Sequence, residues 1–287
     1  MSTQPTEPLF SLCQLTLRNS SFEEDLQLCA DLGIKGFGVE EAKLLETDEA
    51  GMQARMQQLG ISATLCCPRT TSILPSVHVK GASDPDRRVE ELCEGIRRLA
   101  KFDPVSVFMI TGAQGEYDDA TAWRIVVDGM REAVKVAREV NVTLSVEPMR
   151  AEYRAEWCFI NSIADCLRLI EAVGGGLKIT YDTYHLWDSK DVLPLTQEYG
   201  SLVAGVQVAD FRQPMRGFQD RKLPGDGVAN LPEIWFALEQ GGFAGWYDLE
   251  VFSSLEFPDS IWKRPAREWV AEGETKFWRT WNERAEP

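Results

Sequence analysis

The segment Gly176-Leu-Lys-Ile-Thr-Tyr-Asp-Thr-Tyr-His-Leu-Trp187 predicts a buried strand that ends in polar side chains. Its first half is a short apolar, β-branched run after three glycines, a pattern typical of a buried strand. Asp182 and His185 follow where the strand gives way to a loop. A carboxylate and an imidazole are costly in a hydrophobic core, so we expect both to serve an active site.

Three other apolar runs end in a side chain that can bind a metal, and these side chains are Glu147, Gln207 and Glu250. Together with Asp182 they supply three carboxylates and one amide oxygen. Such an oxygen-rich set favours Mn²⁺ or Mg²⁺ and predicts a divalent metal site. The alternative is that each carboxylate caps a neighbouring helix or pairs with an arginine.

Short apolar runs alternate with amphipathic segments along the whole chain. We expect strands near residues 10–17, 36–40, 61–67, 105–110, 142–147, 177–182, 203–210 and 246–250. We expect helices near residues 22–32, 48–59, 86–101, 120–140, 162–173, 193–199, 231–240 and 262–282. This alternation predicts a parallel sheet covered by helices.

Eight strand–helix units without a linker predict an α/β fold, a single (β/α)8 TIM barrel in one domain over residues 1–287. We expect residues 1–8 to form a flexible tail. The alternative is a doubly wound open sheet. It is disfavoured because no glycine-rich GxGxxG motif follows the first strand.

In such a barrel the carboxyl ends of the strands meet at one mouth, where Glu147, Asp182, Gln207 and Glu250 would converge. Residues 68–83 form a loop too long for a simple connection, so we expect His78 in this loop to close over the mouth and bind substrate. Trp157 ends a charged and aromatic segment that we expect to form a lid for a sugar. The alternative for His78 is an ordinary loop histidine.

Composition excludes several classes of function. The formal net charge of −15 argues against binding to nucleic acid or to anionic membranes. No apolar run of about 20 residues is present, so we expect no membrane span. The N-terminus lacks a secretory pattern and the seven cysteines lack metal-type spacing, so we expect a cytoplasmic protein with reduced thiols. No phosphate-binding loop stands out, and we expect an unphosphorylated substrate.

The chain resembles the xylose isomerase-like barrels, a family grouped as sugar phosphate isomerases and epimerases. The resemblance covers almost the whole chain, and its order and spacing are specific for the superfamily but not for one reaction. It rests on Ser21-Phe-Glu-Glu24, Gly33-Ile-Lys-Gly-Phe37, Leu144-Ser-Val-Glu-Pro148, Tyr181-Asp-Thr-Tyr-His185, Asp220-Arg-Lys-Leu-Pro-Gly-Asp-Gly227 and Gly245-Trp-Tyr-Asp-Leu-Glu-Val-Phe252.

This resemblance implies that Glu147, Asp182, Gln207 and Glu250 bind a divalent ion, Mn²⁺ first, with Mg²⁺ or Co²⁺ as alternatives. The family usually carries a histidine at the third of these positions, so Gln207 is a departure. Relatives that resemble dehydroshikimate dehydratases use glutamine there. Asp226 is a second departure, because relatives usually carry glutamate between the two glycines.

The resemblance also implies roles in the reaction. In relatives that epimerise ketoses, the two glutamate ligands move the proton from opposite faces, which assigns catalysis to Glu147 and Glu250. The matching histidine and arginine, His185 and Arg221, contact substrate oxygens. The alternatives are a buried His185 that bonds a backbone carbonyl and a solvated Arg221.

The function we expect is a metal-dependent isomerase or epimerase of a small sugar, polyol or keto-sugar, acting through an enediolate. The alternatives are a dehydratase that resembles dehydroshikimate or inosose dehydratases, supported by Gln207, and a non-catalytic barrel subunit. An endonuclease of the superfamily would need many histidines and a basic face, and this chain has two histidines. Relatives are often dimers or tetramers, so a homo-oligomer stays open.

Overall fold

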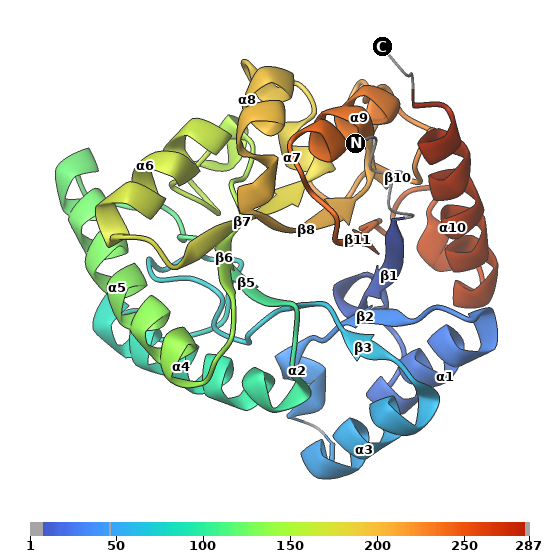
Figure 1. Cartoon of the computed structure of the whole chain (residues 1–287), viewed down its shortest axis with the longest axis horizontal. Helices are drawn as coiled ribbons and strands as arrows, with labels where there is room; N and C mark the ends of the chain where they lie inside the picture. Colours follow the sequence, from blue (N-terminus) through green and yellow to red (C-terminus); the bar gives the residue numbers. More distant parts are fainter. Residues whose placement is uncertain (1–7, 46, 285–287) are drawn as a thin grey trace, which may run out of the picture.

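A parallel sheet of nine strands forms the centre of the molecule (Figure 1). The computed structural model describes residues 8–45 and 47–284. Around the sheet the order of strands is β3-β2-β1-β11-β8-β7-β6-β5-β4. The strands are β1 Leu9–Cys13, β2 Gly36–Gly38, β3 Ser62–Ala63, β4 Leu65–Cys66, β5 Ser106–Met109, β6 Leu144–Val146, β7 Leu177–Asp182, β8 Val203–Val208 and β11 Trp246–Leu249.

The sheet is nearly closed at the segment predicted as one strand over residues 61–67. This segment is divided into β3 and β4, which lie at the two ends of the sheet although they follow each other in the chain. The Thr64 N–H donates to the Phe37 carbonyl at 2.9 Å, and the Ser106 N–H donates to the Thr64 carbonyl at 3.2 Å. The same segment therefore contacts both neighbours, which confirms the predicted TIM barrel over the doubly wound alternative.

Helices surround the strands as an outer ring (Figure 1). Each long predicted helix is present within a few residues of its expected bounds. They are α1 Phe22–Leu32, α3 Glu49–Leu59, α4 Pro85–Leu99, α5 Asp119–Glu139, α6 Ile163–Val173, α8 Val192–Tyr199, α9 Leu231–Gln240 and α10 Ala266–Asn282. The short helices α2 Glu41–Leu44 and α7 Thr183–Leu186 were not predicted, because four residues show no periodicity. Short 3-10 helices cover Gln14–Thr16, Ala100–Phe102, Ala151–Tyr153, Gly200–Leu202 and Ile261–Lys263.

Local signals explain where the elements begin and end. Helix α1 starts at a capping box, in which the Ser21 hydroxyl accepts from the Glu24 N–H and the Glu24 carboxylate accepts from the Ser21 N–H. The last helix begins at Ala266 rather than at residue 262, because Pro265 disfavours a helical conformation in the residue before it. Strand β1 ends at Cys13, where Gln14 turns inward and donates to Asp25 at 2.8 Å.

A layer of hydrogen-bonded polar side chains lies inside the barrel. The Ser145 hydroxyl is 2.7 Å from those of both Ser106 and Thr180. Across the barrel the Thr64 hydroxyl donates to Asp248 at 3.0 Å, and all of these residues are fully buried. Burial raises the pKa of Asp248 to about 8, so this carboxyl group is protonated over most of the neutral range.

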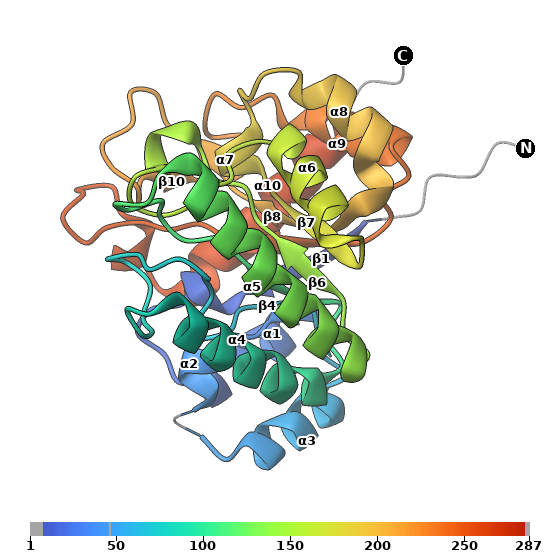
Figure 2. The same cartoon turned by 90° about the vertical axis from the view of Figure 1, so that its left-hand side faces the viewer.

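Long loops extend from the carboxyl ends of the strands (left in Figure 2). The loop after β8 contains a small antiparallel pair, β9 Asp210–Phe211 and β10 Arg221–Lys222. The expected flexible tail lies outside the described residues except for residue 8. In the described part of the chain no helix is both long and apolar enough to span a membrane. All seven cysteines are free and buried, as the sequence predicts.

Candidate active site

The four predicted metal ligands lie together at the carboxyl ends of neighbouring strands. Glu147 follows β6 directly, Asp182 ends β7, Gln207 lies in β8 and Glu250 follows β11. Asp182 and Gln207 are Cα partners in the register of β7 and β8. All four side chains are buried. The parallel topology thus places three carboxylates and one amide at one end of the barrel.

Arg221 from β10 joins two of these carboxylates. Its Nη1 atom lies 2.9 Å from Asp182 Oδ2 and 2.9 Å from Glu250 Oε2. The other oxygen of Glu250 accepts a hydrogen bond from Gln207 Nε2 at 2.7 Å. Arg221 is itself buried, so the alternative of a solvated surface arginine is wrong.

His185 lies on α7 beside Glu147 and Asp182. Its Nε2 atom is 3.6 Å from Glu147 Oε1 and 3.5 Å from Asp182 Oδ2. The donor atoms of these three buried residues all lie within 4.8 Å of one another, and the group could hold a metal ion. On the other side of the ring, Nδ1 accepts from the Arg150 N–H at 3.4 Å. No bond to a backbone carbonyl holds this histidine among its described contacts.

Burial shifts the pKa of the three carboxyl groups and of His185. Desolvation raises the pKa of Glu147 well above its usual value, and the neighbouring Asp182 and Glu250 raise it further. Desolvation also raises the pKa of Asp182, and it raises that of Glu250 to about 7, with Arg221 opposing both. The pKa of His185 falls well below its usual value, because burial and the nearby Arg221 disfavour the imidazolium. Full ionisation would set three buried carboxylates against a single arginine and a neutral histidine, and the raised pKa values of the carboxyl groups reflect this cost.

The residues present fit a divalent metal ion. An excess of two negative charges in a buried site is unfavourable, and a dication would balance it. The Oε1 atom of Gln207 is buried and has no hydrogen-bond partner in the described structure. A buried carbonyl oxygen without a partner is costly, and coordination to a cation would satisfy it.

A cavity of about 570 Å³ opens above these groups at the barrel mouth. Both glutamates and all four predicted substrate-binding residues line it: Glu147, Glu250, His78, Trp157, His185 and Arg221. Its volume lies in the range of about 300–1,000 Å³ that is usual for small-molecule sites. Six of the eight predicted site residues thus line one space, whereas Asp182 and Gln207 are not among its lining residues.

Stacked aromatic rings form one wall of this cavity. The His78 ring stacks on Trp157 with 4.4 Å between centroids, and Trp157 stacks on Phe218 at 4.4 Å, both at 11°. These residues come from the loops after β4, β6 and β9. Phe218 was not predicted, because a single phenylalanine in a polar loop carries no spacing signal.

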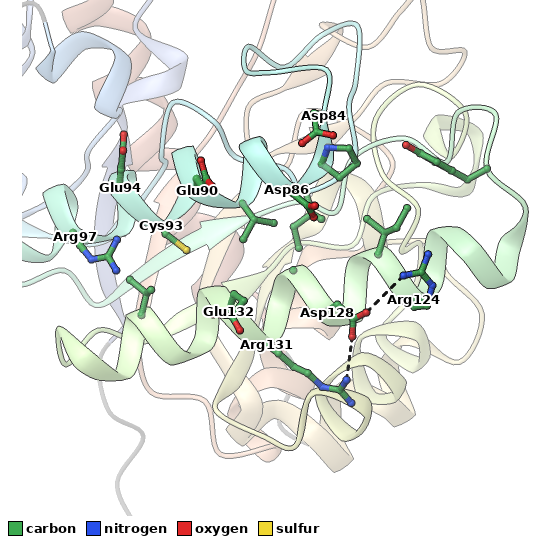
Figure 3. Close-up of a pocket in the computed structure, with 17 residues that line it drawn as sticks. Asp84, Asp86, Glu90, Cys93, Glu94, Arg97, Arg124, Asp128, Arg131 and Glu132 are labelled. Atoms are coloured by element: carbon green, nitrogen blue, oxygen red, sulfur yellow. Dashed lines mark hydrogen bonds and ion pairs between the residues drawn. The ribbon is translucent and has the colours of Figure 1, made fainter.

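A larger cavity of about 960 Å³ lies outside the barrel, in the groove between α4 and α5 (Figure 3). Among its charged side chains, Asp128 lies 3.2 Å from Arg131 and 4.0 Å from Arg124. None of the predicted site residues lines it. The barrel mouth is therefore the candidate active site.

Four basic residues at the mouth were also missed, and they are Arg18, Lys43, Arg69 and Lys80. Each follows β1, β2 or β4 and lies at the carboxyl end of the barrel, where the candidate site residues also lie. These cations are spread across three connections and therefore form no phosphate-binding motif in the sequence.

A parallel barrel with buried carboxylates at its strand ends defines a class, and a family model described as "Xylose isomerase-like TIM barrel" matches residues 26–275. The chain belongs to this family, as the sequence predicts. Among curated proteins it is similar to the L-ribulose-5-phosphate 3-epimerase UlaE of Escherichia coli O157:H7 (strain EC4115 / EHEC). The two are 28% identical over 264 residues, which cover 86% of this chain and 88% of that protein.

Solved structures share the fold. The protein SMc04130 from Sinorhizobium meliloti 1021 superposes with a TM-score of 0.86 at 23% identity, over 95% of this chain and 98% of that one. An L-ribulose 3-epimerase has a TM-score of 0.73 at 20% identity, over 98% and 100% of the two chains. The IOLI protein with a binding zinc atom has a TM-score of 0.79 at 15% identity, over 97% and 99%.

Proposed function

We propose that this protein is a divalent-metal-dependent epimerase or isomerase of a ketose or a related polyol ketone. The observation that carries the proposal is the placement of two buried glutamates on either side of Asp182 and Gln207. Glu147 lies at the end of β6 and Glu250 at the end of β11, with β7 and β8 between them. Two carboxylates that flank a bound sugar can serve its two faces.

Glu147, Asp182, Gln207 and Glu250 would hold the metal, with His185 beside them. When bound, a divalent ion polarises the carbonyl and adjacent hydroxyl of a ketose and stabilises the negative charge of the enediolate. Oxygen donors favour Mn²⁺ or Mg²⁺ in this role. The site supplies the ligands from four consecutive strands of one barrel, so we propose that the chain acts as a single domain.

The two glutamates would move the proton. One takes the proton from the carbon beside the carbonyl group, and the other returns a proton to the opposite face. A general base must be ionised, and Arg221 Nη1, 2.9 Å from Glu250 Oε2, favours the ionised form of this carboxylate against the effect of burial. Gln207 donates to Glu250 at 2.7 Å and fixes the orientation of this carboxylate.

His185 and Arg221 would bind the substrate oxygens. Both line the mouth cavity, and Arg221 Nη2 lies 3.3 Å from His185 Nε2. The aromatic wall of His78, Trp157 and Phe218 would cover the apolar face of the sugar. The similarity to UlaE, by name a 3-epimerase of L-ribulose 5-phosphate, supports epimerisation rather than another reaction of the same enediolate.

A dehydratase is the second candidate. It is favoured by Gln207, an amide where the family usually has histidine. In that reaction the same carbanion would expel a hydroxyl group on the next carbon, and the neutral His185 would donate its ring N–H proton to that group.

The test begins with the metal content of protein purified without chelator, for the wild type and Glu250→Gln. We expect about one divalent ion per chain in the wild type and a large loss in the variant. Glu233→Gln, which makes the same change on the exposed side of α9, is the control and should retain the ion.

The reaction is then followed in D₂O with candidate ketoses. An epimerase or isomerase incorporates deuterium at the carbon beside the carbonyl group, and Glu147→Gln or Glu250→Gln abolishes this exchange. A dehydratase instead removes water from its substrate, which gives a dehydrated product. A wild type that binds no ion after supplementation and exchanges no hydrogen would contradict the proposal.

A further inference from the structure

The half of the mouth opposite the carboxylates is basic. Arg18 follows β1, Lys43 lies on α2 after β2, and Arg69 and Lys80 lie in the loop after β4. All four line the cavity that Glu147 and Glu250 also line. Three connections from the first half of the barrel thus present cations to one space. We call these four residues the basic rim.

The local charge of this rim opposes that of the whole chain. Among the described residues, Glu40 is the one carboxylate besides Glu147 and Glu250 that lines the cavity. Burial raises the pKa of Glu40, and Lys43, Arg18 and Lys80 each oppose the rise, so these cations lie around one carboxylate. In a chain with a net charge of −15, the rim keeps a local positive excess, because Lys43 pairs with Asp25 and three further cations lie near the single carboxylate Glu40.

Three cations of the rim form no ion pair within the described structure, although Arg18 lies over the Trp262 ring at 5.0 Å. Lys43 is occupied, because its Nζ atom lies 2.8 Å from Asp25. The exposed side chains of Arg18, Arg69 and Lys80 form no ion pair with any described carboxylate, whereas most lysines and arginines of this chain do. Like charges held together repel one another, and an anion between them relieves that repulsion.

We propose that the basic rim binds an anionic group at the end of the sugar remote from the reacting carbon, either a phosphoryl group or a carboxylate. The proposal rests on the function proposed above and names its substrate class. Arginine binds both groups through paired N–H donors, and lysine adds a point charge. The expectation of an unphosphorylated substrate assumed a backbone loop as the only anion site, whereas here side chains supply the charge.

The experiment measures ligand affinity by calorimetry on the metal-loaded protein, with three ligands. These are a ketopentose 5-phosphate, the same ketopentose without phosphate, and a ketose with a terminal carboxylate. The variant Arg69→Gln/Lys80→Gln removes two exposed cations whose side chains hold no structural contact with a described carboxylate. Lys35→Gln, an exposed change just before β2 at the other end of the barrel, is the control.

We expect at least one anionic ligand to bind the wild type about tenfold more tightly than the neutral sugar, with the advantage lost in the double variant and kept in Lys35→Gln. Loss for the phosphate alone identifies a phosphoryl site, and loss for the carboxylate alone identifies a carboxylate site. Equal binding of all three ligands by the wild type would overturn the proposal. So would an equal weakening of neutral and anionic ligands in the double variant.

These outcomes are separate from those of the proposed function. Calorimetry reports affinity whether or not the protein turns its ligand over. If the protein prefers the anionic ligand but exchanges no hydrogen in D₂O, the anion site at the basic rim is supported and the epimerase proposal is contradicted. If the protein epimerises neutral and anionic ketoses with equal KM, the epimerase proposal is supported and the anion site at the basic rim is contradicted.

Discussion

Arg221 and Asp182 form a buried ion pair, with 2.9 Å between Nη1 and Oδ2 and with each side chain at most 1% exposed. The same Nη1 atom serves Glu250 at 2.9 Å. This one guanidinium therefore lies between two of the four proposed metal ligands. It stabilises their ionised forms, and it also competes with any second cation for the same oxygens.

Arg221→Gln should bind a divalent ion more tightly than the wild type. The variant leaves Glu147, Asp182 and Glu250 without their arginine, which should cost about 3–5 kcal/mol of stability in the absence of metal. Added Mn²⁺ should then raise the melting temperature of the variant more than that of the wild type. The Kd of the variant for Mn²⁺ should be lower than that of the wild type by up to about tenfold. Thermal unfolding with and without Mn²⁺ measures both effects.

Arg221→Lys is the matched control, since it keeps the charge. It should retain the wild-type response to Mn²⁺ while raising KM for the ketose, because an ammonium lacks the paired donors. Equal Mn²⁺ shifts in Arg221→Gln and in the wild type would show that the guanidinium and the metal do not share ligands.

Gln207→His should change which metal the site prefers. The imidazole replaces the buried amide oxygen, and imidazole favours Zn²⁺ over Mn²⁺ more strongly than an oxygen donor does. The ratio of Zn²⁺ to Mn²⁺ affinity, measured by competition, should rise. Gln207→Leu removes the donor altogether and should weaken both ions. An unchanged ratio in Gln207→His would place Gln207 outside the metal site.

Trp157→Leu should raise KM for the ketose about three- to tenfold and leave kcat within about twofold, because the change removes two ring stacks from the cavity wall. Steady-state kinetics measures both constants. Trp123→Leu is the control, because Trp123 packs against Arg168 outside the mouth. A fall in kcat with an unchanged KM in Trp157→Leu would argue against a substrate-binding wall.

Asp248→Asn should make stability less dependent on pH. The pKa of Asp248 is raised to about 8, whereas an unfolded aspartate has a pKa of about 3.9. The folded state therefore keeps a proton that the unfolded state releases, so this group's contribution is fully present below about pH 4 and is lost as the pH rises to about 8. The slope is about 1.4 kcal/mol per pH unit.

Urea unfolding at several pH values between 5 and 8 compares Asp248→Asn with the wild type. The free energy of unfolding of the variant should increase relative to that of the wild type as the pH rises, since the amide has no proton to lose. Asp103→Asn is the control, because Asp103 is exposed and its φ of 49° is tolerated by asparagine. Parallel pH profiles for Asp248→Asn and the wild type would contradict the assignment.

Strand ends could be predicted from the sequence, because a polar residue that closes an apolar run stands out locally. Glu147, Asp182, Gln207 and Glu250 were found in this way, and the barrel topology explains why they meet. Arg221 needed the resemblance to the family, since it reaches Asp182 from 39 residues away in a polar loop.

Other features lacked any local signal. The layer around Asp248 lies within runs that look apolar, because serine and threonine interrupt them without breaking the strand pattern. The division of residues 61–67 at Thr64 depends on how the sheet closes, which is a property of the whole barrel. The basic rim joins residues from separate connections, and only the fold brings Arg18 near Lys80.

The order of strands around the barrel separates two tasks. The proposed reacting groups come from β6, β7, β8 and β11, and the basic rim comes from the connections after β1, β2 and β4. The basic rim and the proposed reacting groups are therefore encoded in different halves of the chain. Exchanging the loops of the first half between relatives should change the substrate specificity. The residues proposed to transfer protons would stay the same.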